Sequence, residues 1–368
     1  MKILHTSDWH LGHTLYNYDR TVEQQAFLRQ LTRIVTEEQP DAMVVSGDIY
    51  HYSSPAAATQ KMYTDAMLNI HQACPEMTIV VTAGNHDSSS KLEIDSNLWQ
   101  HFGLNVVGNI ERTAEEVNLD KHIIEINNEK KTKGYVIAVP HVYPQNFPLL
   151  DTETPRDQRQ ARFFQALLDE VKKRNTAQLP VVLMAHLSIE GSDRSGHDES
   201  IGGIEYVPLS AMGEGYDYLA LGHIHCPQDI KGSHHHARYC GTPLPVSFDE
   251  TYPHSVSIIE LEKGAEPQIS TREIENPIPL VTLPHDPTPF EDALKLLEEY
   301  PEEKPAYLRL NVLTKGYLPP DCNEKASNAA KGKACKYCYI KTTRERQADT
   351  DESKPISIQE MQEMSPLE

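Results

Sequence analysis

The 368-residue sequence predicts an α/β protein of layered strands and helices, followed by a small α+β domain. Short apolar runs alternate with segments of helical periodicity from residue 1 to about residue 270. A proline-rich stretch over residues 276–289 interrupts this alternation and marks a boundary. We therefore expect a first domain over residues 1–275, a second over 276–345, and an acidic segment over 346–368.

Five short apolar runs are candidate strands of the first domain, at residues 3–4, 43–45, 79–81, 181–184 and 218–221. Apolar side chains recur at helical spacing over residues 20–38, 56–73 and 159–174, which predicts three helices there. Pro40 is expected to end the first of these helices. Residues 254–261 alternate at a period of two, which is typical of a half-buried antiparallel strand.

The second domain is expected to contain strands near residues 280–283, 307–313 and 337–343, with a helix over 289–299. The acidic, polar composition of the last twenty residues or so predicts loose order. No apolar run approaches the roughly 20 residues that span a bilayer, so we expect no membrane association. The N-terminus lacks the apolar core of a signal peptide, and we expect a cytoplasmic protein.

The formal net charge of −20 argues against a protein that holds nucleic acid by basic charge alone, because phosphate binding usually needs clustered Lys and Arg. It does not exclude a nucleic-acid enzyme, since bound divalent cations or a partner subunit would bring positive charge to the site. We expect weak DNA binding by the isolated chain.

Polar side chains suited to metal binding follow each of the five apolar runs. They are Asp8, His10, Asp48, Asn85, His186, His223 and His225. Ligands of open α/β sheets bind outside the carboxyl ends of the strands, so these residues are expected to converge on one crevice. Residues two apart in extended chain share a face, which lets Asp8 and His10 reach one cation, and His223 and His225 repeat this spacing.

Two carboxylates, one amide and four imidazoles exceed what one ion needs, so two ions are expected, with Asp48 as the candidate bridge. Carboxylates and imidazoles without thiolate favour Mn²⁺, Fe²⁺ or Zn²⁺. Two such ions can activate water and hold a phosphate through its hydrolysis. Taken singly, an Asp after a strand is usually a turn or cap residue and a His is usually structural. Their ordered combination favours a metal site.

His86 is a separate candidate because the cluster has enough ligands without it. We expect it to act as a general acid beside the leaving oxygen, with Asp87 orienting its ring and keeping it charged. The alternative is a purely structural His86–Asp87 pair. His51, three residues after Asp48, is a candidate phosphate contact, and a role outside the site is an equal alternative.

The motifs Asp8-x-His10, Gly47-Asp48, residues 84–87 (Gly-Asn-His-Asp), His186 and Gly222-His223-x-His225 together resemble the calcineurin-like metallophosphoesterase superfamily. Residues 5–12 (HTSDWHLG) and 239–250 (YCGTPLPVSFDE) resemble the SbcD branch of the Mre11-type nucleases. The resemblance covers most of residues 1–345. It implies a β-sandwich flanked by helices as the nuclease domain, with residues 276–345 as a capping domain over DNA. The segment 346–368 would begin an ATPase-docking region that is truncated or missing.

The resemblance also implies how the ligands divide. One ion would be held by Asp8, His10, Asp48 and His225, and the other by Asp48, Asn85, His186 and His223. The family's metal is typically manganese, and His86, paired with Asp87, would act on the leaving group.

By the same resemblance, the chain would degrade duplex DNA from 3′ ends and cut single strands and hairpins, in DNA end processing, repair and recombination. It would act as a homodimer with an SbcC-type (Rad50-like) ATPase, and residues 56–73 and 94–102 are candidates for the dimer contact. Two alternatives remain. One is a phosphoesterase with another substrate, although the Asp-Arg-Gly of protein phosphatases is absent after Gly47. The other is a non-catalytic subunit that tethers DNA ends, although no ligand is missing.

Overall fold

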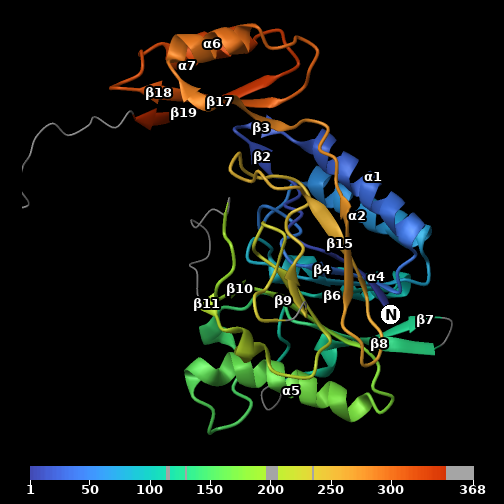
Figure 1. Cartoon of the computed structure of the whole chain (residues 1–368). Coiled ribbons are helices and arrows are strands. Elements are labelled where there is room, and N and C mark those ends of the chain that lie inside the picture. The colour runs from blue at the N-terminus through green and yellow to red at the C-terminus, as the bar shows by residue number, and fades with distance from the viewer. Residues whose placement is uncertain (113–116, 129–130, 196–205, 234–235, 345–368) are drawn as a thin grey trace, which may run out of the picture. The chain divides into compact units, whose positions relative to one another are not determined.

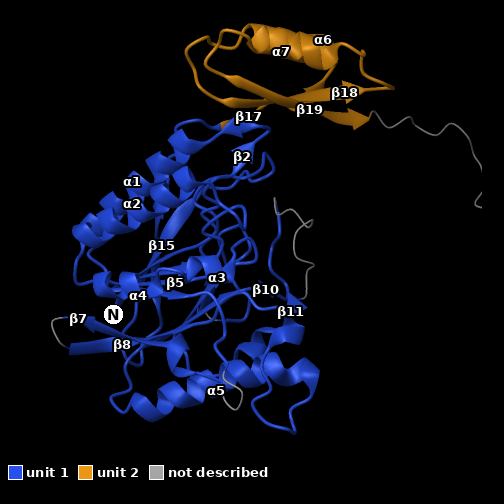
Figure 2. Ribbon diagram, turned by 180° about the vertical axis from the view of Figure 1, so that it is seen from behind, with its two compact units in different colours: residues 1–279 blue, residues 280–368 orange. Residues whose placement is uncertain are grey.

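The computed structural model describes residues 1–112, 117–128, 131–195, 206–233 and 236–344, and the predicted acidic segment 346–368 lies outside them. The chain divides into two compact units, residues 1–279 and residues 280–368 (Figure 2). The division falls inside the proline-rich stretch.

Two six-stranded sheets form the centre of the first unit. The first sheet has the order β16-β15-β1-β4-β5-β6, with β1 Lys2–Thr6, β4 Ala42–Ser46, β5 Thr78–Thr82, β6 Leu104–Val107, β15 Ser255–Glu260 and β16 Gln268–Glu273. The second has the order β13-β14-β12-β9-β8-β7, with β7 Ile123–Asn128, β8 Lys131–Ala138, β9 Val181–His186, β12 Tyr218–Gly222, β13 Gln228–Asp229 and β14 Ala237–Tyr239. The strands β1, β4, β5 and β6 run parallel, as do β8, β9 and β12.

The two sheets pack face to face over a shared hydrophobic core. This core includes Ile3, Val44 and Val80 from the first sheet and Val136, Met184 and Ala220 from the second. Every residue of β4, β9 and β12 is buried, because each strand is covered on both faces. This double burial explains why the sequence shows continuous apolar runs here. The structure has a strand at each of the five predicted positions, which confirms that prediction.

Helices cover the outer faces of the sandwich. The helices α1 (Thr21–Glu38) and α2 (Ala57–Ala73) pack on the first sheet, and α5 (Arg159–Arg174) packs on the second (Figure 1). The result is the predicted α/β architecture with helices flanking a β-sandwich. All three helices were predicted to within one residue at each end, and α1 ends before Pro40, where Gln39 adopts a left-handed φ of 42°.

Short elements connect these layers. They are β2 Thr14–Leu15, β3 Tyr18–Asp19, α3 Ser89–Leu92, β10 Ser188–Ile189, β11 Tyr206–Val207 and the 3₁₀ turns η2 Asp120–His122, η3 Pro144–Asn146, η4 Arg156–Gln158 and η5 Leu209–Met212. Residues 94–102, a candidate dimer contact, contain one α-helical turn, α4 (Ser96–Trp99), followed by a 3₁₀ turn, η1 (Gln100–Phe102). Gly103 ends it with a left-handed φ of 66°.

The second unit contains a three-stranded parallel sheet, with β17 (Leu280–Thr288), β18 (Tyr307–Thr314) and β19 (Lys336–Arg344) in that order. Parallel neighbours need crossover connections, and the helices α6 (Phe290–Glu298) and α7 (Cys322–Ala330) supply them. The two helices and the sheet enclose a separate core that includes Leu297 and Leu308.

Among the described helices, none combines the length and the apolar character that crossing a membrane requires.

Candidate metal centre

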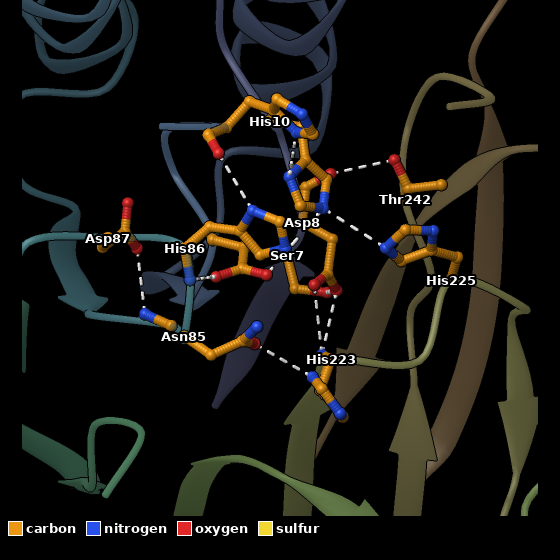
Figure 3. Close-up of polar contacts among 12 residues, drawn as sticks. Ser7, Asp8, His10, Asn85, His86, Asp87, His223, His225 and Thr242 are labelled. Atoms are coloured by element: carbon orange, nitrogen blue, oxygen red, sulfur yellow. Dashed lines mark hydrogen bonds and ion pairs between the residues drawn. The ribbon is translucent and has the colours of Figure 1, made fainter. Parts of the chain in front are cut away.

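The seven predicted metal ligands follow the carboxyl ends of five strands. Asp8 and His10 follow β1, Asp48 follows β4, and Asn85 follows β5. The remaining three lie at the ends of strands in the second sheet: His186 closes β9, and His223 and His225 follow β12. Figure 3 shows Asp8, His10, Asn85, His223 and His225 directed toward one another. The ends of two facing sheets therefore build the site together.

The backbone is strained where it presents these ligands. Asp8, His10, Asp48 and His223 adopt positive φ values of 53°, 44°, 52° and 98°. Such conformations cost a non-glycine residue about 1–3 kcal/mol each, and they persist only where the surroundings enforce them. Here the two loops are bonded together, because the Asp8 N–H donates to Gly47 O at 3.0 Å and the His10 N–H donates to Asp48 O at 3.1 Å.

Two glycines allow the loops to approach so closely. A Cβ on Gly47, whose φ is +87°, would lie 2.2 Å from Nδ1 of His186. A Cβ on Gly84 would lie 2.0 Å from Oδ1 of Asp48. Any larger residue at either position would therefore displace a predicted ligand.

The first group of ligand atoms joins Asp8, His10 and His225, whose donor atoms all lie within 4.8 Å of one another. The Nε2 atoms of His10 and His225 are 3.2 Å apart, and Oδ2 of Asp48 is 3.8 Å from the His10 Nε2. Two nitrogens bound at about 2.1 Å to one cation lie roughly 3.0–3.4 Å apart, so this spacing suits a shared ion.

The second group joins Asp48, Asn85, His186 and His223. Oδ1 of Asn85 lies 2.9 Å from Nε2 of His186 and 3.0 Å from Nδ1 of His223. Oδ2 of Asp48 lies 3.4 Å from Nε2 of His186. The same Asp48 oxygen thus faces both groups, which is the position a bridging carboxylate needs.

Hydrogen bonds behind the rings direct their nitrogens into the centre. Nδ1 of His186 donates to Ser46 O at 2.7 Å, and Nδ1 of His225 donates to Oε1 of Glu250 at 2.9 Å. Because each Nδ1 carries the proton, Nε2 of the neutral ring offers a lone pair toward the other ligands. Metal-binding histidines are usually held in this way, so the residues present fit divalent metals.

Charge in the buried centre is balanced between carboxylates and imidazoles. Burial raises the pKa of Asp8. Burial also opposes ionisation of Asp48, but the His186 imidazole holds the pKa of Asp48 well below its usual range. Burial lowers the pKa of His186, but Asp48 and Asp8 outweigh burial and raise it to about 9. A cation entering the centre would displace such a proton.

His86 and His51 lie beside the first group. The His86 N–H donates to Oδ1 of Asp48 at 2.9 Å, and its Nδ1 donates to His51 O at 2.9 Å. The rings of His86 and His51 stack, with their centroids 5.2 Å apart. Nδ1 of His51 lies 3.3 Å from Nδ1 of His10. A carbonyl only accepts, so the His86 proton is fixed on Nδ1 and Nε2 is the nitrogen left to meet a substrate.

The structure corrects the predicted role of Asp87. Its carboxylate accepts the backbone N–H groups of Gly84 at 2.9 Å, Ile49 at 3.1 Å and Tyr50 at 2.9 Å (Figure 3 shows it apart from the His86 ring). Asp87 therefore joins the loops after β4 and β5, and does not orient the His86 ring. Burial raises its pKa to about 6.

Sequence reasoning missed three residues that support the centre. Glu250 is buried behind His225, Thr242 donates from Oγ1 to Asp8 O at 2.8 Å, and Ser7 donates from Oγ to Oδ2 of Asp8. Glu250 and Thr242 belong to the segment 239–250, which was noted only for its family resemblance. No local spacing marked any of the three.

Comparisons with known proteins identify the family of this chain. A family model described as calcineurin-like phosphoesterase matches residues 1–227, and one described as type 5 capsule protein repressor C-terminal domain matches residues 276–368. A Rhodobacter capsulatus protein named as the SbcD subunit of nuclease SbcCD is 33% identical over 309 residues, covering 81% of this chain and 75% of its own. A protein of the same name from Escherichia coli K12 is 29% identical over 330 residues, which cover 86% of this chain and 79% of the relative.

A Bacillus subtilis protein of the same name is 31% identical over 277 residues, covering 72% of this chain and 68% of its own. Among solved structures, a dimetal phosphatase from Danio rerio aligns with 74% of this chain and 98% of its own, with a TM-score of 0.39 and 13% identity. The chain therefore belongs to the calcineurin-like phosphoesterases and, within them, to the SbcD family. It is a metal-dependent phosphodiester hydrolase that uses divalent metals.

Proposed function

We propose that this chain is the DNA-cutting subunit of an SbcCD-type nuclease and works with two Mn²⁺ ions. The observation that carries the proposal is the complete ligand set, in which Asp48 faces both groups. A relative that is 33% identical over 309 residues is named as a nuclease subunit. A tethering subunit without catalysis would have no need to retain all seven side chains.

The proposed chemistry is hydrolysis of a DNA phosphodiester. Two divalent ions held by these seven ligands would activate a water molecule at neutral pH and stabilise the charge that develops on the phosphate. His86 in its charged form donates a proton from Nε2 to the leaving oxygen, since its Nδ1 is committed to the His51 carbonyl. His51, stacked on His86, contacts the phosphate from the same side.

The proposal extends to substrates and partners. We assign to the chain 3′-to-5′ exonuclease activity on duplex DNA and endonuclease activity on single strands and hairpins, in DNA end processing, repair and recombination. An SbcC-type ATPase would join it, as the names of the relatives suggest. That partner would supply positive charge that a chain of net charge −20 lacks. Residues 276–345 would act as the capping domain. A cytoplasmic location stays a prediction from sequence.

A homodimer is part of the proposal. Two large apolar side chains are exposed here: Ile94, just before α4, by 79%, and Leu98, within α4, by 58%. Exposed apolar side chains that cluster on a surface usually mark an interaction site. Ile94 and Leu98 lie in residues 94–102, which the family resemblance indicates as a dimer contact. We therefore assign the dimer contact to residues 94–102 together with α2.

The proposal is tested by nuclease assays with Mn²⁺ on an end-labelled hairpin and a linear duplex. Wild type should cut both, and His86→Gln should lose activity by about 10²–10⁴-fold while it still binds Mn²⁺, because general acid catalysis contributes about that much. Glu262→Gln, an exposed residue outside both the centre and the proposed dimer contact, should behave as wild type.

Other outcomes point to the alternatives. If wild type hydrolyses a small phosphodiester but leaves both DNAs intact even when its ATPase is added, the substrate is another phosphodiester. If it hydrolyses nothing and still binds DNA ends, the chain is a tethering subunit.

A further inference from the structure

A cluster of aromatic side chains lies beneath the proposed dimer contact, and Tyr63 of α2 is at its centre. The Tyr63 side chain is 4% exposed. Its ring centroid lies 6.5 Å from that of Trp9, 5.6 Å from that of Tyr50 and 6.4 Å from that of Trp99. Aromatic rings about 4.5–7 Å apart attract one another beyond the effect of their burial, so these four side chains form one packed group.

Two members of this cluster belong to the loops that present predicted metal ligands. Trp9 stands between Asp8 and His10 in the chain and is buried. Tyr50 follows Asp48 by two residues and packs on the same hydrophobic core. One or two peptide units therefore separate each ring from a ligand, and a displacement of Trp9 or Tyr50 would move metal-binding atoms.

The other two members, Tyr63 and Trp99, belong to the segments assigned to the dimer contact, α2 and residues 94–102. Trp99 is buried, whereas Ile94 and Leu98 of the same segment are exposed. The segment thus presents apolar side chains outward and holds Trp99 inward against Tyr63. A second copy that packs on this segment would therefore act on the ring that contacts both ligand loops.

A cavity of about 310 Å³ adjoins the cluster. Its lining includes the rings of Tyr50, Tyr63 and Trp99 and the side chains of Leu92 and Ile94. Because Ile94 is exposed and lines the cavity, the cavity reaches the surface at the proposed dimer contact. Folded proteins are close-packed, so packing around the two tyrosine rings is incomplete in a single copy of the chain. An apolar side chain that filled the cavity would restrict both rings.

We propose that association with a second copy of this chain and Mn²⁺ binding strengthen each other, and that Tyr63 is the positioning residue that couples them. The proposal rests on the proposed dimer and names its effect on the metal centre. In a twofold-symmetric dimer each copy offers both the cavity and the exposed Leu98, so Leu98 of each copy fills the cavity of the other. If the dimer binds Mn²⁺ more tightly, Mn²⁺ must tighten the dimer by the same factor.

The test is sedimentation velocity of the full chain over a dilution series, once with saturating Mn²⁺ and once with EDTA. In wild type, Mn²⁺ should lower the dimer dissociation constant by about fivefold or more, which is the lower end of the usual coupling between two sites. In Tyr63→Leu, the same addition should change the constant by less than about twofold, because leucine loses the ring contacts with Trp9 and Tyr50.

Tyr63→Phe and Phe163→Leu are the matched controls, and both should keep the wild-type effect of Mn²⁺. The Tyr63 hydroxyl is buried and has no hydrogen-bond partner within the described part of the chain, so phenylalanine retains what the coupling needs. Phe163 belongs to the separate core under α5. All variants carry the same charge, so a general effect of Mn²⁺ on repulsion between copies would appear in each. Thermal melting checks the fold, and Tyr50→Leu decides if Tyr63→Leu does not fold.

A wild-type dimer with the same dissociation constant in Mn²⁺ and in EDTA would overturn the coupling and leave the proposed dimer standing. A wild-type effect of Mn²⁺ that persists in Tyr63→Leu would remove Tyr63 from the coupling. A wild type that is monomeric at every concentration would remove both the dimer and the coupling. Cleavage of DNA by the same samples tests the proposed nuclease separately from either result.

Discussion

Glu250 illustrates how a residue that is not a predicted ligand can govern the metal centre. Its buried carboxylate accepts from Nδ1 of His225 at 2.9 Å and from the Val246 N–H at 3.3 Å. Burial lowers the pKa of His225, but Glu250 outweighs burial and raises it. The carboxylate thus makes Nε2 of His225 more basic and fixes its direction toward His10.

We predict that Glu250→Gln weakens Mn²⁺ binding about 10–100-fold, because partners behind a metal-bound histidine usually contribute that much. The amide keeps the size of the side chain but removes its charge. Calorimetric titration with Mn²⁺ measures the effect, and Glu260→Gln, at the exposed end of β15, is the control. An unchanged Mn²⁺ affinity in Glu250→Gln would assign Glu250 to packing alone.

The role of a single residue could be predicted from the sequence where a metal-binding side chain directly follows a candidate strand. Asp8 and His10 both follow an apolar run, and their spacing alone suggested a shared ion. Glu250 lies 25 residues from His225, so only the folded chain brings them together. The role predicted for Asp87 was wrong because its partners at Ile49 and Tyr50 are backbone groups of another loop, which no side-chain pattern can indicate.

Helices and strands could be predicted from the sequence where burial gives their apolar residues a regular spacing. The helix α5 places Phe163, Phe164 and Leu167 in the core, and this spacing is visible in the sequence. The helix α7 was missed because only Cys322, Ala326 and Ala330 are buried on it, so its apolar face is small. The hairpin of β7 and β8 was also missed. That the strands form two facing sheets was expected only from the family resemblance and not from any local pattern, since pairing joins strands such as β1 and β15 that are distant along the chain.

The segment around α4 can be tested as the site of the proposed dimer contact. The double variant Ile94→Glu, Leu98→Glu should shift the proposed dimer to monomer and raise its dissociation constant at least tenfold, because buried carboxylates without partners disfavour an apolar contact. Sedimentation velocity measures the shift. Leu149→Glu, a substitution of a leucine that is 50% exposed elsewhere in the first unit, is the control. A wild type that is monomeric at micromolar concentration would contradict the dimer itself.

In the whole molecule, the predicted metal ligands belong to one folded unit, and a second unit is built around a separate core. All seven predicted ligands lie in residues 1–279, whose three cores are built from residues of that unit alone. The second unit has a core of its own, in which Leu297 and Leu308 are fully buried. A domain with its own core is expected to be able to fold independently.

This separation predicts that damage to one core spares the other. Leu297→Ala should destabilise the second unit by about 2–5 kcal/mol, the usual cost of a Leu-to-Ala change in a core. Thermal unfolding should show two transitions, of which only one moves, while Mn²⁺ affinity and hydrolysis of a small phosphodiester stay at wild-type levels. Leu31→Ala, in the core under α1, should move the other transition. DNA cleavage should fall in Leu297→Ala if the second unit caps the DNA. A loss of Mn²⁺ affinity in that variant would instead mean that the two units depend on each other to build the metal centre.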